Sequence, residues 1–466
     1  MNQFVSSPHR RRRDSQRTLN LLRRFESPNV TFIEPDGSWP VIWERARGVH
    51  VWDANGRRYV DLTAAFGVAA AGHANPRVIR RGQLQLAKLV HAMGDVHPHS
   101  LKAELARELS RMTFERWFKR FAQTRKPAVP TGKTIFCNSG FEAVEAALKT
   151  AILATDRPGI IAFEHGYHGL GHGALNLTHR NHFRGPFRPQ LREFGHFVPY
   201  PGADTDHSSS GRRIRTRDSL DSVQRQIEHL LATKRIGAII AEPVQARGGI
   251  NVPSPQFLPM LRRLCDRHRV LLVLDEIYTG FGRTGKWFAC EHTATIPDIV
   301  CLGKALTGGF PLSAMVGRAD IMDTAWPKSR GEAIHTSTFL GNPVGCAMAL
   351  AQIREIQRLR LPERSARLGG FLLDALNGIA SRPSRLRLRA RGIGLMAGLE
   401  MRNKDGSPAT QLTFEIIKRL LHRGFILLPE GEHGNVISFT PPLTIRHEHL
   451  SRSVAALRSE FQSIAI

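Results

Sequence analysis

The sequence predicts an α/β fold in which a mostly parallel sheet carries helices on both faces and is joined to a smaller α+β unit. Between residues 76 and 342, short apolar runs alternate with helical patterns, which is the order expected for parallel strands joined by crossover helices. One of these runs, 270–274, is apolar throughout and bounded by charged residues, as expected of a strand that is buried on both faces. After residue 343 this alternation stops, which predicts the second unit.

The N-terminal region divides into two parts. Residues 1–28 are rich in arginine and poor in acidic residues, so we expect a basic arm, either a disordered tail or a targeting segment, with a short helix over 19–25. Strand-like patterns then cover 41–46, 49–53 and 57–62. Asn55-Gly56, between the last two, is the strongest two-residue hairpin signal, so a small antiparallel unit is predicted here.

The middle of the chain supplies the strands and helices of the main sheet. The predicted strands are 134–137, 159–163, 236–241, 270–274, 299–302 and 312–316. The predicted helices are 76–91, 100–112, 140–154, 220–233, 255–268 and 343–359. The C-terminal part is expected to contain strands 385–389, 394–401, 425–428 and 436–439, helix 411–423 and a final helix. The serine- and arginine-rich stretch 208–217 is predicted to be a surface insertion.

Composition limits the possible partners and locations. Sixty-six Lys and Arg against 40 Asp and Glu give a net charge of +26, so nucleic acid or an anionic surface is an alternative partner. The positive residues are dispersed and no nucleic-acid-binding motif is present, so we favour an arginine-rich solvated surface. The five cysteines include no Cys-x-x-Cys pair, which favours a reducing cytosol over disulfides or zinc. We expect a cytoplasmic protein with no bound metal, secretory signal or membrane-spanning segment.

A carboxylate and a lysine each follow a predicted buried strand. Asp275 is the first polar residue after 270–274, and Lys304 follows 299–302 through Gly303. Ligands of open α/β sheets bind outside the carboxyl ends of the strands. Pyridoxal phosphate needs a lysine amine for its Schiff base and a carboxylate that keeps its pyridine nitrogen protonated. The alternatives are an ordinary strand-end carboxylate and a solvated loop lysine.

Two turns that follow strands have features of a cofactor site. Ser139 and Glu142 have capping-box spacing, and the first turn of the helix offers free N–H groups to a phosphate. Any strand-to-helix turn shares these features. Tyr167 lies between glycines and can stack on a flat ring. The alternatives are a core tyrosine and, for the adjacent His168, a loop histidine.

Several separated motifs occur in one order along the chain. They are Asn-Ser-Gly-Phe-Glu-Ala from Asn138, Tyr-His-Gly from Tyr167, Glu-Pro-Val-Gln from Glu242, Leu-Asp-Glu-Ile-Tyr-Thr-Gly-Phe-Gly-Arg-Thr-Gly from Leu274, Leu-Gly-Lys-Ala-Leu from Leu302 and His-Thr-Ser-Thr-Phe-Leu-Gly-Asn-Pro from His335. Together they resemble the class III (ω-amino acid) aminotransferases, which are pyridoxal-phosphate enzymes of fold type I. The resemblance extends from Val41 to the C-terminus, and the combination is specific although each motif alone is not.

The resemblance implies an architecture and an assembly. It implies a large cofactor-binding domain with a mostly parallel seven-stranded sheet, and a small α+β domain built from both chain ends. The expected division is a basic arm at 1–28, the small domain at 29–75 and 343–466, and the large domain at 76–342. It also implies a homodimer with shared active sites, in which Thr338 reaches the phosphate of the neighbouring subunit.

The resemblance also assigns roles within the site. Lys304 would form the internal aldimine and shuttle the proton, and Asp275 would pair with the pyridinium nitrogen. The remaining cofactor contacts expected are Ser139, Gly140 and Phe141 at the phosphate, Tyr167 and Ile277 on the two ring faces, and Glu242 and Tyr278 beside them. Two positions depart from the usual pattern, because Phe141 stands where a small residue is common and Tyr278 where glutamine is common.

The substrate-binding positions depart further from the family. Many relatives pair a glutamate in the turn after Glu-Pro-x-Gln with a C-terminal arginine that binds the substrate carboxylate. The matching positions here are Arg247 and Ser438, and serine cannot replace the bidentate guanidinium. We expect either that Arg247 has taken over carboxylate recognition or that the donor presents its carboxylate elsewhere. Arg184 is a weaker candidate, and a solvent-facing Arg247 is the alternative.

The function expected from the resemblance is transfer of an amino group from an ω-amino acid or diamine, such as a 4-aminobutyrate- or ornithine-like donor, to a 2-oxo acid through a Schiff base on Lys304. One alternative is a glutamate-1-semialdehyde-type aminomutase, which shares the fold and the lysine but needs no external 2-oxo acid. Another is a basic nucleic-acid- or anion-binding protein on an inherited fold. The donor itself does not follow from these residues, because specificity depends on a few side chains and loops.

Overall fold

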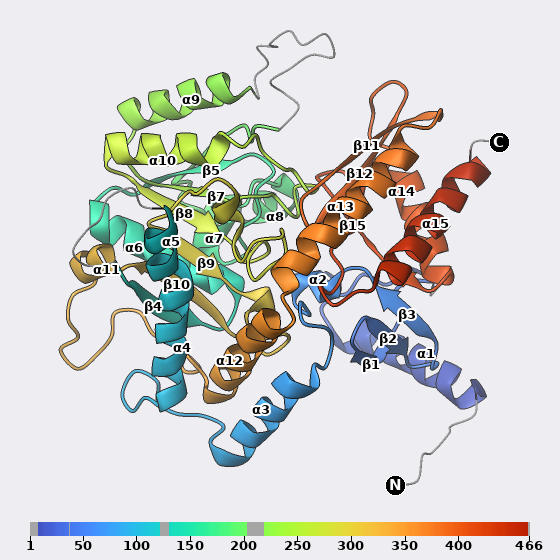
Figure 1. Ribbon diagram of the computed structural model, residues 1–466, viewed down its shortest axis with the longest axis horizontal. Helices are drawn as coiled ribbons and strands as arrows, with labels where there is room; N and C mark the ends of the chain where they lie inside the picture. Colours follow the sequence, from blue (N-terminus) through green and yellow to red (C-terminus); the bar gives the residue numbers. More distant parts are fainter. Residues whose placement is uncertain (1–7, 37, 122–129, 203–218, 465–466) are drawn as a thin grey trace.

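A computed structural model describes residues 8–36, 38–121, 130–202 and 219–464 of the chain. Its central sheet has seven strands, in the spatial order β4 (Gly132–Cys137), β10 (Ser313–Arg318), β9 (Ile299–Leu302), β8 (Leu271–Asp275), β7 (Ile236–Ala241), β5 (Gly159–Phe163) and β6 (Gly195–Val198) (Figure 1). Strand β10 is antiparallel to both of its neighbours, and the other neighbouring strands are parallel. The predicted α/β fold with a mostly parallel sheet is confirmed.

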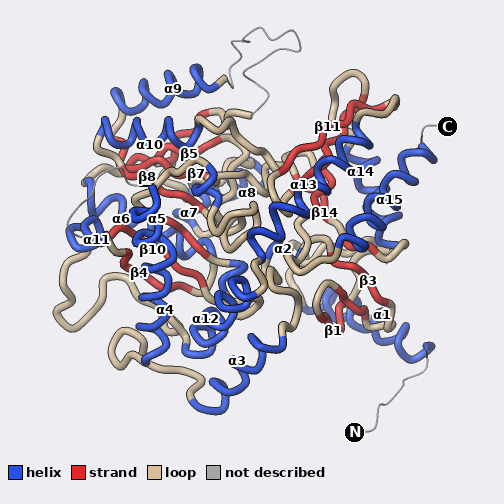
Figure 2. Tube along the Cα trace, in the orientation of Figure 1, coloured by secondary structure: helices blue, strands red, loops and turns tan. Residues whose placement is uncertain are grey.

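Helices cover both faces of this sheet because successive side chains of a strand point to opposite faces. In β8, Leu272 packs into one core cluster and Val273 into the other. Helix α6 (Gly140–Thr155) contributes buried alanines to the cluster that contains Val273, whereas α9 (Leu220–Thr233) and α10 (Phe257–His268) contribute to the cluster that contains Leu272. Figure 2 shows the strands enclosed by helices on both sides. Burial on both faces explains why these strands are apolar throughout.

The other helices surround the sheet or form the second unit. They are α1 (Pro8–Phe25), α2 (Ala64–Gly67), α3 (Pro76–Lys88), α4 (Ser100–Ser110), α5 (Arg116–Phe121), α7 (His172–Leu175), α8 (Asn181–Arg184), α11 (Ala319–Ala325), α12 (Pro343–Arg358), α13 (Leu361–Ala380), α14 (Thr410–His422) and α15 (His447–Ile464). Within the described ranges, no helix combines the length and the apolar character that crossing a membrane requires.

Two small sheets form the second unit. One has the order β1 (Trp43–Arg47), β2 (His50–Asp53), β3 (Arg58–Asp61) and β13 (Phe425–Ile426). The other has the order β11 (Leu386–Gly392), β12 (Ala397–Asn403), β15 (Val436–Phe439) and β14 (Leu428–Glu430). Strand β13 is parallel to β3, so segments from the two ends of the chain share one sheet. In Figure 1 the blue N-terminal strands accordingly lie beside the red C-terminal elements.

Several elements differ from the sequence-based expectation. The arm contains helix α1 over Pro8–Phe25 rather than a short helix at 19–25, and Leu19 is buried. Strand β6 and helix α13 were not predicted. The segment of β6 is only four residues long, and Pro362 near the start of α13 reads locally as a helix breaker, although proline is well suited to a first helical turn. The predicted insertion at 208–217 lies outside the described residues.

Candidate active site

The candidate active site lies where β8 and β9 end at the same edge of the sheet. Asp275 is the last residue of β8, and Lys304 follows β9 through Gly303 with a left-handed φ of 39°. A cavity of about 420 Å³ opens at this edge. Its lining residues are Gly140, Phe141, Tyr167, His168, Gly169, Leu170, Glu242, Ala246, Arg247, Asp275, Ile277, Tyr278 and Lys304. Most of the predicted site residues therefore meet in one cavity.

Asp275 is held by two hydrogen bonds at the floor of the cavity. Its Oδ2 lies 2.8 Å from His168 Nδ1, and its Oδ1 accepts a 3.1 Å bond from the Ile277 backbone N–H. Both Asp275 and His168 are buried. Burial alone would lower the pKa of His168, but the hydrogen bond and charge of Asp275 outweigh burial and raise this pKa above its ordinary value. The imidazole therefore fixes the position of the Asp275 carboxylate at this edge of the sheet.

The role of His168 was missed in the sequence, where it was considered only as a loop histidine. A usable signal was its position shortly after the carboxyl end of β5, at the sheet edge where Asp275 also emerges. The segment is fixed further by Thr178, whose hydroxyl accepts from the His168 N–H at 3.0 Å and donates to the Gly169 carbonyl at 2.8 Å.

Lys304 places its amine inside the cavity. Its Nζ lies 4.6 Å from the centre of the Tyr278 ring. Burial lowers the pKa of Lys304 below its ordinary value, and the negative charges of Asp275 and Glu242 only partly oppose this shift. A lowered pKa increases the fraction of neutral amine, which is the nucleophilic form. Tyr278 is positioned in turn by a 3.1 Å hydrogen bond between its hydroxyl and Thr440 Oγ1.

Glu242 ties two loops of the cavity together. Its carboxylate accepts hydrogen bonds from the backbone N–H of Tyr167 at 3.0 Å and of Ala246 at 3.2 Å. Burial raises the pKa of Glu242 to about 7. The Tyr167 ring packs edge-on against Phe183 with 5.6 Å between ring centres. Glu242 thus fixes the backbone from which the Tyr167 ring enters the cavity.

The turn between β4 and α6 contains a buried hydroxyl, that of Ser139, that makes no hydrogen bond. Ser139 is the residue before the first turn of α6, but it makes no side-chain capping bond, and its Oγ is buried without a hydrogen-bond partner. The predicted capping box is therefore wrong. Glu142 accepts from the Asn138 backbone N–H at 2.8 Å instead of from Ser139. A side chain at Gly140 would place its Cβ 3.1 Å from Ile277 Cδ1, so glycine keeps this turn open next to the cavity.

Arg247 lines the cavity and lies beside a buried carboxylate, that of Glu430. Its guanidinium is 5.6 Å from the Tyr167 ring centre, and its Nε is 3.6 Å from Glu430 Oε2. That Nε is buried and makes no hydrogen bond. Burial raises the pKa of Glu430 to about 7, although the positive charge of Arg247 acts in the opposite direction. Arg247 therefore faces the cavity with a counter-ion that is only partly ionised near neutral pH.

Glu430 was also missed in the sequence. It lies on β14 next to β15, which carries Ser438, and Ser438 Oγ is used to donate a 3.0 Å hydrogen bond to the Leu428 carbonyl. Arg247 in the turn is therefore paired with Glu430 on the sheet, while Ser438 makes no contact of this kind. The signal available in the sequence was an acidic residue eight positions before Ser438.

Three predicted site residues are not among the cavity-lining residues. Arg184 is buried, with its guanidinium 4.8 Å from the Phe197 ring centre and its Nη2 3.7 Å from Glu193 Oε1. Thr338 is exposed in the segment between α11 and α12. Of the predicted residues, Ser139 also lies just outside the lining set, directly before Gly140.

Comparisons with known proteins agree with this arrangement. Residues 33–460 match the family model for aminotransferase class-III. The 5-aminovalerate aminotransferase DavT of Pseudomonas aeruginosa is 35% identical over 91% of this chain and 94% of its own length. The 4-aminobutyrate aminotransferase GabT of Escherichia coli is 33% identical over 91% and 93%. The putrescine aminotransferase of Pectobacterium atrosepticum is 33% identical over 94% and 87%.

Solved structures agree as well. An amine transaminase from an uncultivated Pseudomonas species, in the PLP-bound (internal aldimine) form, has a TM-score of 0.81 and 28% identity over 95% of this chain and 99% of that one. The ornithine aminotransferase of Toxoplasma gondii has a TM-score of 0.79 and 26% identity over 99% and 96%. A fold with these strand-end residues, and relatives of this kind, define an enzyme that transfers amino groups. The chain belongs to the class III aminotransferase family, which confirms the resemblance seen in the sequence.

Proposed function

We propose that this transaminase uses pyridoxal phosphate to move an amino group from an ω-amino acid or diamine to a 2-oxo acid. One observation carries this proposal. Asp275 ends strand β8, and Lys304 follows the adjacent strand β9, so both residues lie at the same edge of the sheet. The names of the relatives support the donor class, because they specify 5-aminovalerate, 4-aminobutyrate and putrescine. They do not favour an aminomutase or a non-enzymatic binding protein.

The residues present fit the cofactor. Asp275 offers a buried carboxylate that lines the cavity, and Lys304 offers an amine whose pKa is lowered by burial. The unpartnered Ser139 hydroxyl and the open turn at Gly140 suit a phosphate at the start of α6. When bound, pyridoxal phosphate supplies an electron sink for the negative charge that develops when the donor carbon loses a proton.

The protein's own groups then have separate tasks. Lys304 Nζ accepts the proton from the amino-bearing carbon of the donor and later returns it, since burial lowers its pKa and a neutral amine is a suitable general base. Asp275, which is held by its hydrogen bond with His168, would pair with the ring nitrogen of the cofactor. Tyr167 and Ile277 line the cavity and would contact the two faces of the cofactor ring. Phe141, Glu242 and Tyr278 line the same cavity and would help to hold the cofactor.

Recognition of the acceptor is assigned to Arg247. Its buried Nε lacks a hydrogen bond, and a guanidinium can hold a carboxylate through two parallel bonds. When a 2-oxo acid occupies the cavity, its carboxylate replaces Glu430 as the partner of Arg247. Arg184 is the second candidate for this role, although it lies away from the lining residues.

The proposal includes a homodimer in which Thr338 reaches the phosphate of the neighbouring subunit. Its exposure in the segment before α12 leaves the side chain available to a partner. Light scattering of the purified protein should give twice the mass of the 52.0 kDa chain. A monomer that retains full activity would remove Thr338 from the site.

The direct test is the visible absorbance of the purified protein, recorded with single amines and without an acceptor. A Schiff-base band that shifts with an ω-amino acid or diamine is expected, and a 2-oxo acid should restore it. Lys304→Ala should lower turnover by about 10²- to 10⁴-fold or more, since it removes the general acid–base. Conversion of a semialdehyde without any 2-oxo acid would instead indicate an aminomutase.

A further inference from the structure

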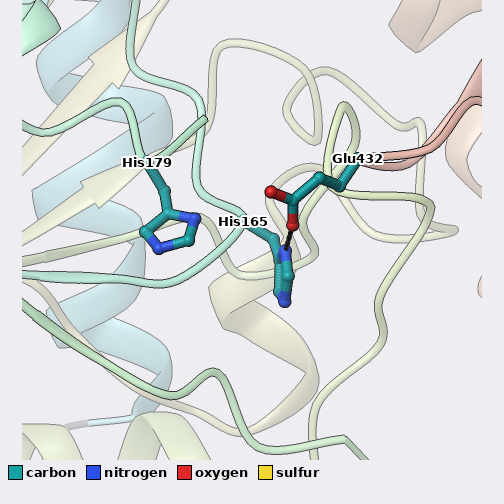
Figure 3. Close-up of side chains that lie close together, drawn as sticks. All are labelled: His165, His179 and Glu432. Atoms are coloured by element: carbon teal, nitrogen blue, oxygen red, sulfur yellow. Dashed lines mark ion pairs between the residues drawn. The ribbon is translucent and has the colours of Figure 1, made fainter. Parts of the chain in front are cut away.

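Outside the proposed cofactor cavity, three potential metal ligands from separate parts of the chain meet at one place. They are His165 after β5, His179 between α7 and α8, and Glu432 after β14 (Figure 3). One ligand atom from each side chain lies within 4.8 Å of the other two. We propose that these side chains bind a divalent transition-metal ion, with Zn²⁺ as the best match.

The ring of His179 supplies an independent reason to expect a ligand. Its Nδ1 is buried and has no hydrogen-bond partner, and a buried polar atom without a partner carries a free-energy cost. Figure 3 shows one ring nitrogen of His179 turned toward the other two residues. His165 Nδ1 already lies 3.0 Å from Glu432 Oε2. A cation between them would satisfy all three groups.

The three ligand atoms lie farther apart than they would around a bound zinc ion. Zinc bonds of about 2.0–2.1 Å in a tetrahedron place ligand atoms about 3.3 Å apart, so the group must contract from 4.8 Å. The side chains of His165 and Glu432 are 41% and 37% exposed and have room to move. His179 is the fixed member, since its backbone N–H donates to the Gly166 carbonyl at 2.9 Å and its ring packs 5.2 Å from Phe197. Water can fill the fourth position.

The ligand types select among metals. Two imidazoles and one carboxylate suit Zn²⁺ and neighbouring transition metals, whereas Ca²⁺ and Mg²⁺ prefer oxygen ligands. Glu164 adds a second negative charge near His179, and Arg184 adds a positive one. Arg180 also lies close, but its Nη2 donates to the backbone carbonyl of Glu432 at 3.0 Å. Arg180 therefore does not bond the Glu432 carboxylate, whose partner is His165.

Occupancy of this site would stiffen one wall of the candidate active site. His165 lies two residues before Tyr167, and Glu432 lies two residues after Glu430. The Gly431 N–H donates to the Arg247 carbonyl at 3.1 Å, so the same turn also contacts the arginine. The ion would join the loop that carries Tyr167 to the strand end that carries Glu430. Binding of the ion does not depend on the proposed substrate and can be measured separately.

The test uses the purified full-length holoenzyme without an amino donor, treated with a chelator and then with ZnCl2. Elemental analysis should find one zinc ion per chain, and anomalous diffraction at the zinc edge should place it between the three side chains. The Tm should rise with zinc, because a ligand that binds the folded state stabilises it. His179→Phe and Glu432→Ala should lose both effects, and His229→Ala, which changes an exposed histidine on α9, should keep them.

Equal zinc uptake by the wild type, His179→Phe and Glu432→Ala would overturn the proposal, as would an anomalous peak elsewhere or no uptake at all. If His179→Phe does not fold, Glu432→Ala decides the matter, since its side chain is substantially exposed and its loss should not disturb the core.

Discussion

His168 Nδ1 and Asp275 Oδ2 lie 2.8 Å apart at the floor of the candidate active site, although the two residues are 107 positions apart in the chain. The contact joins the segment after β5 to the end of β8. Because both side chains are buried, the hydrogen bond forms in a region of low dielectric, where charged pairs interact strongly. The position of the Asp275 side chain therefore depends on His168, for which the sequence suggested only a loop histidine.

Replacement of His168 tests this dependence. His168→Phe should lower kcat by about 10- to 100-fold, since a hydrogen bond to a charged group contributes about 1.5–3 kcal/mol. His168→Gln can still donate a hydrogen bond and should retain more activity. Steady-state kinetics and the absorbance spectrum of the bound cofactor measure both effects. If His168→Phe folds normally and keeps wild-type kcat, the pair has no positioning role.

Arg247 and Arg184 can be separated by parallel substitutions. Arg247→Ala should raise the KM for a 2-oxo acid by about 10- to 100-fold, because it removes a charge-assisted contact to the acceptor carboxylate. Arg184→Ala should leave this KM unchanged, since Arg184 packs on Phe197 beside Glu193. Kinetics at a saturating donor concentration give the two values. The opposite result would transfer carboxylate recognition to Arg184.

Glu430 should make acceptor binding depend on pH. Its pKa is raised to about 7 by burial, so the carboxyl is ionised above this pH and competes with the substrate for Arg247. As the pH falls through about 7, the competitor becomes neutral, and the KM for the 2-oxo acid should decrease. Glu430→Gln should have a low KM that varies little between acid and alkaline buffers. A wild-type KM without this pH dependence would exclude competition by Glu430.

The same carboxyl should affect stability. Its folded pKa of about 7 exceeds the ordinary value of 4.5, so between these values the folded state binds more protons than the unfolded state. The resulting contribution is fully present below pH 4.5 and is lost as the pH rises toward 7. Thermal melts should therefore show a smaller decline over this window for Glu430→Gln than for the wild type. Parallel curves for the two proteins would show that the pKa of Glu430 is not raised.

Adjacent glycines in α13 offer a matched pair for stability. A Cβ at Gly369 would lie 2.1 Å from the Gly394 carbonyl oxygen, whereas a Cβ at Gly370 would meet nothing within 4 Å. Gly370→Ala should stabilise the protein by about 0.5–1 kcal/mol through helix propensity. Gly369→Ala should destabilise it, because the contact is with backbone and cannot relax easily. Denaturant unfolding of both variants compares them directly, and similar stabilities would contradict the close approach of α13 to Gly394.

Local sequence patterns predicted an element correctly where a single segment contains all the residues that define it. The strands β5, β7 and β9 have the predicted limits because burial on both faces requires a continuous apolar run. Asp275 and Lys304 were found because polar residues at the carboxyl ends of such strands are conspicuous. Helix α1 was underestimated, since its arginine-rich sequence has few apolar residues apart from the buried Leu19 and its neighbours.

The sequence by itself determined the order of strands and helices, the lysine and carboxylate of the site, and the motifs that mark a class III aminotransferase. The tertiary structure decided which groups meet: His168 with Asp275, Glu430 with Arg247, and Glu142 with Asn138 rather than Ser139. The physical reason is that the spacing of apolar residues, which predicts strands and helices, can be read directly from neighbouring positions in the sequence. An ion pair or a buried hydrogen bond depends instead on distances and burial, which exist only after distant segments have packed together.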